Sequence, residues 1–177
     1  MLISLSHHFL CPHCSLSLTI ELGAGCGLAG LFAATIGAKL VILTDLPEQI
    51  PHLEANLSLN RHLIPGEVIC LPFTFGETFS DLLAALRVHS SPLIQELMNS
   101  NQDPTQLRID CLIGADIGYD VSLLSPLSTS VYSVMYSSLS LCCRAYLVEA
   151  GMYSTSQSSQ PLTPDTSAME RYLLLVP

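Results

Sequence analysis

The sequence predicts an α/β fold built on a mostly parallel sheet, and two observations support that prediction. Apolar, β-rich runs alternate with helical runs along the chain. Two late runs, IDCLIGA (109–115) and RAYLVEA (144–150), are almost continuously apolar, which is typical of central parallel strands buried on both faces. Because the chain has 177 residues, 49% of them hydrophobic, we expect one domain with one core.

The first elements form a βαβ unit. We expect a strand at 17–22, a helix at 27–37, a strand at 39–44 and, further on, a strand at 67–73. A helix is expected between the second and third strands, from Pro47 or Pro51 to His62, because proline is tolerated in a first helical turn. Asp45 can cap this helix.

The later elements are less regular. A helical insertion is expected at about 77–108, closed by the polar loop NSNQDPTQ, and a serine-rich crossover helix is expected from 123 to 141. Three regions therefore make up the chain. They are an irregular lead-in (1–15), a core (16–150), and a polar tail (151–177) with a final strand at 172–176.

The stretch IELGAGCGLAG (20–30) contains the spacing GxGxxG, formed by Gly25, Gly27 and Gly30. A glycine-rich turn between a strand and a helix lets the backbone approach a ligand and presents helix amides to it. Asp45 ends the next strand, where a ribose-binding acid is expected. The pattern favours a nucleotide-like cofactor. Glycines that only permit a tight turn and close packing, with Asp45 as a helix cap, are the structural alternative.

Glu21 separates two classes of cofactor. A carboxylate at this strand end would repel the pyrophosphate of a dinucleotide. S-adenosylmethionine carries a sulfonium and an ammonium, and both cations suit an acid there. The sequence therefore favours a methyl donor. No metal is needed, because methyl transfer is an in-line displacement governed by positioning.

Several segments together resemble a known family. ELGAGCGLAGLFAATIGAKLVILTDL, NLSLNRHL, FGE and GADIGYD resemble the seven-strand (class I) S-adenosylmethionine-dependent protein-lysine methyltransferases with a DxxY motif, also called methyltransferase family 16. The resemblance covers residues 18 to 120 and is closest to the branch that methylates the ATPase valosin-containing protein. It implies a Rossmann-like sheet, S-adenosylmethionine as cofactor and a lysine of a non-histone protein as acceptor. An ATPase or chaperone-like protein is the expected kind of partner.

The resemblance also implies the roles of individual residues. Those expected to bind the cofactor are Glu21, Gly23, Gly25, Gly27, Asp45, Phe75 and Ala115. Among them, Asp45 would hold the ribose, and Phe75, where the family usually has tryptophan, would pack near the adenine. Asp116 and Tyr119 match DxxY and would stand at the mouth of the lysine channel as the catalytic pair. A capping role for Asp116 and a rim position for Tyr119 are the structural alternatives.

The sequence departs from the family at both ends. The strand and helix that usually precede the glycine loop, and the helix and strand pair that usually follow RAYLVEA, are not recognisable. We therefore expect an incomplete sheet of the class I methyltransferase type. Its cofactor loop should form, but cofactor affinity and turnover should be weak compared with a chain that carries the missing elements.

Three other functions compete with lysine methylation. A nucleic-acid methyltransferase shares the glycine loop, but the net charge of −9 disfavours a phosphate-rich substrate. A nicotinamide oxidoreductase is disfavoured by Glu21. A non-catalytic module that binds cofactor or a partner, derived from the same fold, is the alternative from another class.

Composition and terminal residues predict a cytoplasmic protein, also compatible with the nucleus. Neither a signal peptide nor a membrane-spanning run of about 20 apolar residues is recognisable. The seven cysteines are scattered, as expected for reduced thiols. Cys11 and Cys14 have zinc-like spacing without a second pair, so we favour an irregular lead-in over a metal site.

Overall fold

The computed structural model describes residues 18–100, 107, 109–137 and 144–148. These residues contain a parallel five-stranded sheet with the order β3-β2-β1-β4-β5. The strands are β1 (Leu18–Leu22), β2 (Leu40–Asp45), β3 (Glu67–Pro72), β4 (Cys111–Ala115) and β5 (Arg144–Val148). The helices are α2 (Leu28–Thr35), α3 (Ile50–Asn60), a 3-10 turn (Arg61–Leu63), α4 (Phe79–Val88), α5 (Pro92–Ser100) and α6 (Val121–Ser137).

This architecture confirms the predicted α/β fold with a parallel sheet. Each expected strand and helix within the described residues is present, with bounds shifted by a few residues. The helical stretch expected at about 77–108 contains α4 and α5. The lead-in with Cys11 and Cys14, the polar loop after α5, the tail and the strand expected at 172–176 lie outside the described residues.

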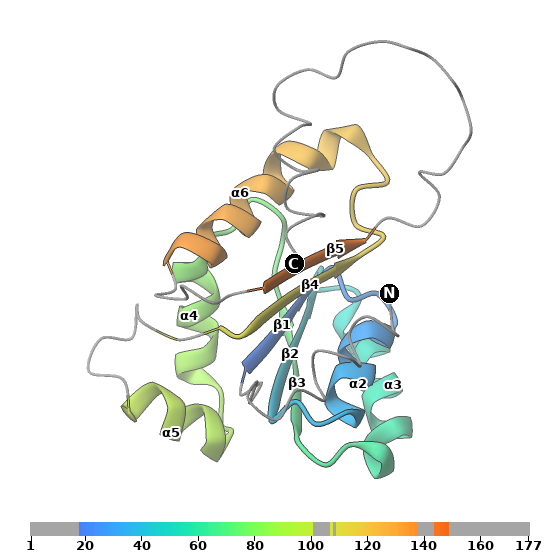
Figure 1. The fold of residues 1–177 in the computed structure, drawn as a ribbon, viewed down its shortest axis with the longest axis vertical. Coiled ribbons are helices and arrows are strands. Elements are labelled where there is room, and N and C mark those ends of the chain that lie inside the picture. The colour runs from blue at the N-terminus through green and yellow to red at the C-terminus, as the bar shows by residue number, and fades with distance from the viewer. Residues whose placement is uncertain (1–17, 101–106, 108, 138–143, 149–177) are drawn as a thin grey trace.

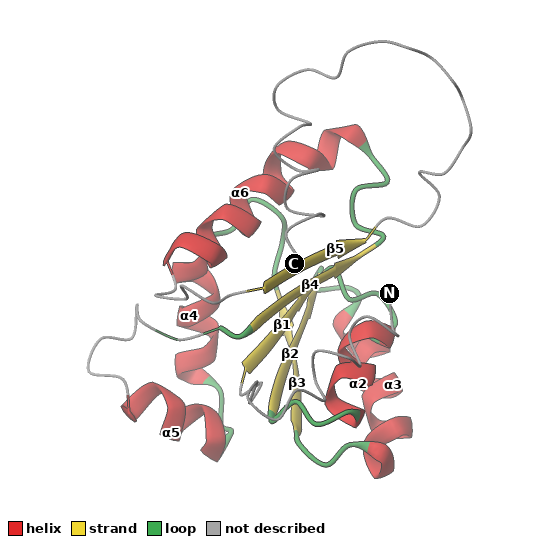
Figure 2. Cartoon of the chain, in the orientation of Figure 1, coloured by secondary structure: helices red, strands yellow, loops and turns green. Residues whose placement is uncertain are grey.

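Helices cover both faces of the sheet (Figures 1 and 2). α2 and α3 pack on one face, where Val41 and Leu43 of β2 meet small alanines of α2. α4 and α6 pack on the other face, where Leu40 and Ile42 belong to the same cluster as Phe79 of α4. Because both faces are covered, β1 is buried at every residue, including the polar residues Thr19 and Glu21.

The helix that follows β2 begins later than the cap interpretation requires. α3 starts at Ile50, with Gln49 at its N-cap position and no side-chain cap. The backbone N–H of Gln49 donates to the carbonyl of Leu46 at 2.9 Å, so a turn separates Asp45 from the helix. The interpretation of Asp45 as a helix cap is therefore wrong. Its carboxylate accepts a bond from the glycine loop instead.

Two serines of the serine-rich helix α6 form hydrogen bonds to the loop between β3 and α4. Ser130 is fully buried, and its hydroxyl accepts a bond from the N–H of Gly76 at 2.9 Å and donates to the carbonyl of Glu77 at 2.8 Å. The hydroxyl of Ser133 accepts from the N–H of Phe79 at 2.8 Å. These bonds fix the loop between β3 and α4, so residues with poor helix propensity serve a tertiary role here.

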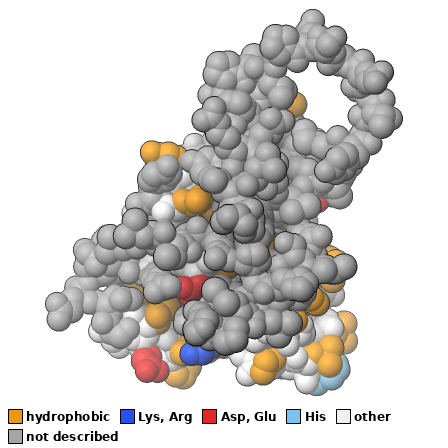
Figure 3. Space-filling model, viewed as in Figure 1, with side chains coloured by type: hydrophobic (Ala, Val, Ile, Leu, Met, Phe, Trp, Pro, Cys, Tyr) orange, Lys and Arg blue, Asp and Glu red, His pale blue; other side chains and the backbone are white. Residues whose placement is uncertain are grey.

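Figure 3 shows one face of the molecule. The described side chains visible on it are mostly hydrophobic, with a few acidic and basic ones between them (Figure 3). Among the described residues, none of the helices combines the length and the apolar character needed to cross a membrane.

Candidate active site

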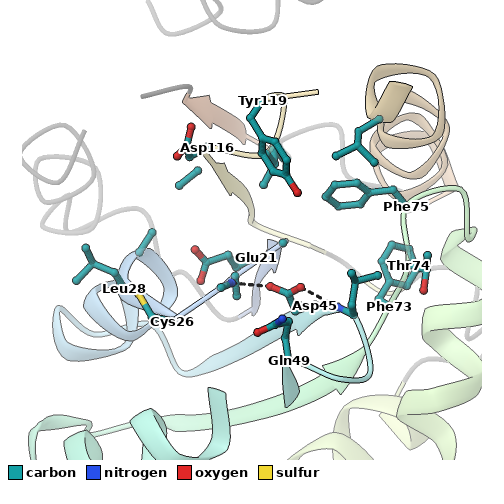
Figure 4. A pocket seen from close by; sticks show the side chains of 18 of the residues that line it. Glu21, Cys26, Leu28, Asp45, Gln49, Phe73, Thr74, Phe75, Asp116 and Tyr119 are labelled. Atoms are coloured by element: carbon teal, nitrogen blue, oxygen red, sulfur yellow. Dashed lines mark hydrogen bonds between the residues drawn. The ribbon is translucent and has the colours of Figure 1, made fainter. Parts of the chain in front are cut away.

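A cavity of about 650 Å³ opens at the carboxyl ends of β1, β2 and β4 (Figure 4). β1 lies in the sheet between β2 and β4. From β1 the strand order runs through β2 to β3 on one side and through β4 to β5 on the other, so the carboxyl end of β1 is the switch point of the sheet. Ligands of open α/β sheets bind at such points. The lining includes Glu21, Gly23, Ala24, Gly25, Cys26, Leu28, Ala29, Asp45, Leu46, Gln49, Phe73, Thr74, Phe75, Ala115, Asp116, Ile117, Tyr119, Leu123 and Pro126.

The glycine loop joins β1 to α2 beneath this cavity. Gly23 and Gly25 have φ values of 60° and 56°, a region that side chains rarely adopt. A Cβ atom on Gly23 would lie 2.7 Å from Ile117 and 3.1 Å from the ring of Phe75, so glycine here lets these two lining residues pack against the loop, whereas a Cβ on Gly25 would meet nothing within 4 Å. Of the predicted cofactor residues, only Gly27 does not line the cavity. The N–H of Gly27 donates a hydrogen bond to the carbonyl of Ala24, and a Cβ on Gly27 would collide with Leu53 of α3.

Glu21 is a buried acid at the floor of the cavity, with 2% of its surface exposed. One carboxylate oxygen accepts the backbone N–H of Gly30 in α2 at 2.8 Å. Burial raises the pKa of Glu21 to about 8; the bond from Gly30 lowers it, and the nearby charge of Asp45 raises it. Without a ligand this acid therefore holds its proton at neutral pH, and a cationic ligand would favour its ionised form.

Asp45 ends β2 and is half-buried. One oxygen accepts the N–H of Gly25 at 2.6 Å, and the other accepts the N–H of Leu46 at 2.7 Å (Figure 4). The side chain thus ties the glycine loop to the end of the neighbouring strand while lining the cavity. A carboxylate has about four lone-pair directions, so both oxygens keep acceptor capacity for hydroxyl groups of a ligand.

Aromatic side chains form the wall beside β3. Phe73 is buried, Phe75 is half-buried, and both line the cavity with Thr74 between them (Figure 4). The backbone of this loop is held by the carboxylate of Glu77, which accepts the N–H of Thr74, and by Ser130 of α6. The wall is therefore fixed from two directions.

Asp116 and Tyr119 lie on the opposite, open side, after β4. Both are exposed and both line the cavity (Figure 4). Asp116 has a φ of 59°, the one non-glycine residue with positive φ among the described residues. Such conformations are uncommon outside glycine, asparagine and aspartate, and they concentrate at functional sites.

Asp116 does not cap α6. The helix begins at Val121, and Asp120 provides the cap, because its carboxylate accepts the backbone N–H of Ser122 at 2.8 Å. This bond lowers the pKa of Asp120. The capping alternative for Asp116 is wrong, and Asp116 is one of the residues that line the cavity.

Sequence reasoning had not assigned several residues that the structure brings to the cavity. Leu46 and Gln49 lie one and four residues after Asp45, and Phe73 follows the last residue of β3. The rule that carboxyl ends of parallel strands share one edge could have indicated all three. Pro126 and Leu123 come from inside α6, and no local sequence signal marks them.

The chain was compared with known proteins. Residues 11–89 match the model of a family described as lysine methyltransferase, Methyltransf_16. Protein-lysine methyltransferase METTL21E of Mus musculus is 36% identical over 91 residues, 45% of this chain and 37% of that protein. The Bos taurus protein of the same name is 33% identical over 91 residues, 45% of this chain and 31% of its own length. Ribosomal protein L11 methylase from Lactobacillus delbrueckii subsp. bulgaricus, a solved structure, has 16% identity and a TM-score of 0.37, covering 71% of this chain and 50% of that one.

Over residues 11–89, the chain is similar to the lysine methyltransferases of this family, which agrees with the predicted resemblance. The matching stretch spans about a third of the length of these two METTL21E relatives. The assignment to the branch that acts on valosin-containing protein stays a prediction.

The family implies S-adenosylmethionine as cofactor, and the residues of the cavity fit it. Of the described residues, three acids and no lysine or arginine line the cavity, which suits a ligand with two cationic groups and opposes a pyrophosphate. Space is open beside Gly25 at the turn, and the aromatic wall offers an apolar surface for a flat ring.

Proposed function

We propose that this protein is an S-adenosylmethionine-dependent methyltransferase whose acceptor is a lysine amine of a non-histone protein. The observation that carries the proposal is one cavity that combines the acidic glycine-loop side with Asp116 and Tyr119 on its open side. The first half suits the cofactor, and the second is accessible to a side chain of another protein.

The proposed roles follow from chemistry and position. S-adenosylmethionine supplies a methyl group on a sulfonium, which departs as a neutral thioether. Glu21, beneath the cavity, compensates the positive charge of the ligand, and Asp45 accepts bonds from its hydroxyl groups. Asp116 accepts a hydrogen bond from the incoming amine and directs its lone pair, while Tyr119 borders the path of the lysine side chain. The proton leaves the lysine ammonium before transfer, and the exposed carboxylate of Asp116 can pass it to water.

Cofactor binding tests the first half of this proposal. Isothermal titration calorimetry should show binding of S-adenosylmethionine and of its demethylated product, but not of NAD. Replacing Asp45 by alanine removes ligand contacts and the anchor of Gly25, so affinity should fall by roughly 1.5 to 3 kcal/mol. Equal affinity of the two proteins, or a preference for NAD, would contradict the cofactor assignment.

Methyl transfer tests the second half. The protein is incubated with labelled donor and a cell extract, and modified proteins are identified by mass spectrometry. Lys39 is the one lysine of this chain, so Lys39→Arg serves as the control for self-labelling. Label on lysine of extract proteins supports the proposal. Label on RNA but not on protein would refute it.

A further inference from the structure

Exposed apolar side chains and acids surround the open side of the cavity. We call Leu28, Asp116, Tyr119 and Asp120 the acceptor rim. The exposed fractions of Tyr119 and Leu28 are 77% and 64%. Leu28, Asp116 and Tyr119 also line the cavity, and in the close view Asp116 lies between the other two (Figure 4). Apolar side chains next to a binding cavity are a common feature of interaction sites.

The charge of the rim is negative. Asp116 and Asp120 are both exposed, and Asp120 is held by its bond from Ser122, so its position at the rim is fixed. The lowered pKa of Asp120 keeps it ionised at neutral pH.

No cation with a described side chain lies near enough to line this cavity. Lys39 stands just before β2, at the end of that strand opposite to Asp45. Arg61 donates to the carbonyls of Ile64 and Gly66, and Arg87 lies in the last turn of α4. The acids of the rim are therefore not neutralised by described basic side chains of the protein itself.

We propose that the acceptor rim binds a segment of a partner protein in which the acceptor lysine is flanked by a large apolar residue and by arginine or a second lysine. The identity of the acceptor rests on the proposed function; the apolar and basic flanks follow from the rim. A lysine that enters between Asp116 and Tyr119 would place a neighbouring apolar residue over Leu28, where apolar contact is available. Basic flanks would face Asp116 and Asp120, and such complementarity favours both orientation and association rate.

Peptide binding tests this proposal without requiring turnover. Fluorescence anisotropy is measured with the protein saturated with S-adenosylhomocysteine. The first peptide has a central lysine flanked by leucine and arginine. In the second, serine replaces leucine, and in the third, glutamate replaces arginine. The first peptide should bind most tightly, and the third should bind most weakly because glutamate meets like charge.

A pair of variants assigns the effect to the rim. Leu28→Ser should weaken binding of the first peptide by up to about tenfold, the loss expected when one apolar contact is removed. Leu59→Ser makes a similar change at a site on α3 that is 73% exposed and does not line the cavity. It should leave peptide binding unchanged. Affinity for S-adenosylhomocysteine is measured for each variant and peptide binding is compared at saturation, so that a change in cofactor binding is separated from a change in peptide binding.

The outcomes separate this proposal from the proposed function. Equal binding of all three peptides, binding of none, or equal weakening by Leu59→Ser would overturn the rim proposal while leaving cofactor binding and methyl transfer to be judged by their own assays. If the cofactor does not bind but the peptides are discriminated as expected, the docking surface stands and the proposed function fails.

Discussion

The two sides of the cavity are built differently. On the cofactor side, Glu21 and Asp45 are each bonded to a backbone amide of the loop or helix that they face. On the acceptor side, Asp116 and Tyr119 are exposed and stand on a loop. The first side is thus fixed by the interior of the fold, whereas the second can change with little effect on the interior. Substitutions on the cofactor side should therefore change cofactor affinity and stability together. Substitutions on the acceptor side should change the choice of acceptor with little effect on stability.

The largest expected effect concerns Glu21 on the cofactor side. Because burial raises its pKa from 4.5 to about 8, the folded protein retains this proton over a range in which the unfolded chain has lost it. The unfolding free energy should therefore fall as the pH rises from 4.5 to about 8 and then level off, by up to about 5 kcal/mol. Glu21→Gln is neutral throughout, so this contribution should be absent.

Denaturation with urea at a series of pH values in this range measures the effect. The difference in unfolding free energy between Glu21→Gln and the wild type should grow with pH. Glu96→Gln, an exposed change on α5, is the matched control and should follow the wild type. Parallel pH profiles for the wild type and Glu21→Gln would show that Glu21 titrates normally.

The second effect concerns the contact between α2 and the sheet. A Cβ on Gly30 would lie 2.2 Å from Leu43 and 2.6 Å from the carboxylate of Glu21, both of which are buried. Gly30→Ala should therefore lower the unfolding free energy by about 2 to 3 kcal/mol, although alanine is the better helix former. Ser58→Ala, at an exposed position of α3, measures the gain in helix propensity without a steric clash. A Gly30→Ala protein as stable as the wild type would show that α2 can move away from the sheet.

A smaller effect is expected from Ser130, which supports the aromatic wall. Ser130→Ala leaves the N–H of Gly76 and the carbonyl of Glu77 without this hydroxyl partner. The unfolding free energy should fall by roughly 1 to 2 kcal/mol, and cofactor affinity should fall with it because Phe75 is on the same loop. Ser128→Ala, on the exposed side of α6, should change neither quantity. Loss of stability with unchanged cofactor affinity would separate this loop from the binding site.

The smallest change in stability is expected on the acceptor side. Asp116→Asn keeps a residue type that tolerates positive φ and is exposed, so the unfolding free energy should stay within about 0.5 kcal/mol of the wild type. The methyl-transfer rate should nevertheless fall by roughly a hundredfold, with cofactor affinity retained. A variant that loses stability and cofactor affinity together would mean that the two sides are coupled.

The cofactor side was largely predictable because its parts are contiguous in sequence. The strand, the glycine turn, the helix and Asp45 occur within one βαβ unit, so alternation and spacing place them together. The DxxY residues could be placed because they directly follow a buried strand.

The remaining features depend on contacts between distant residues. Ser130 and Ser133 meet the loop after β3 across a separation of about fifty residues, and helix propensity alone assigns them an unfavourable role. Gly27 belongs to the glycine motif, but the side chain of Leu53, on another helix, determines that it is a packing position. Neither contact leaves a periodic signal in the sequence.

The positive φ of Asp116 also limits how this site can evolve. Glycine, asparagine and aspartate accept that backbone readily, whereas most other side chains would strain it by about 1 to 2 kcal/mol. Substitutions that preserve the loop are thus confined to a small set, and asparagine is the one that keeps a polar group of the same size. During evolution, a change of the group that accepts the methyl would therefore strain the backbone least if asparagine replaced Asp116.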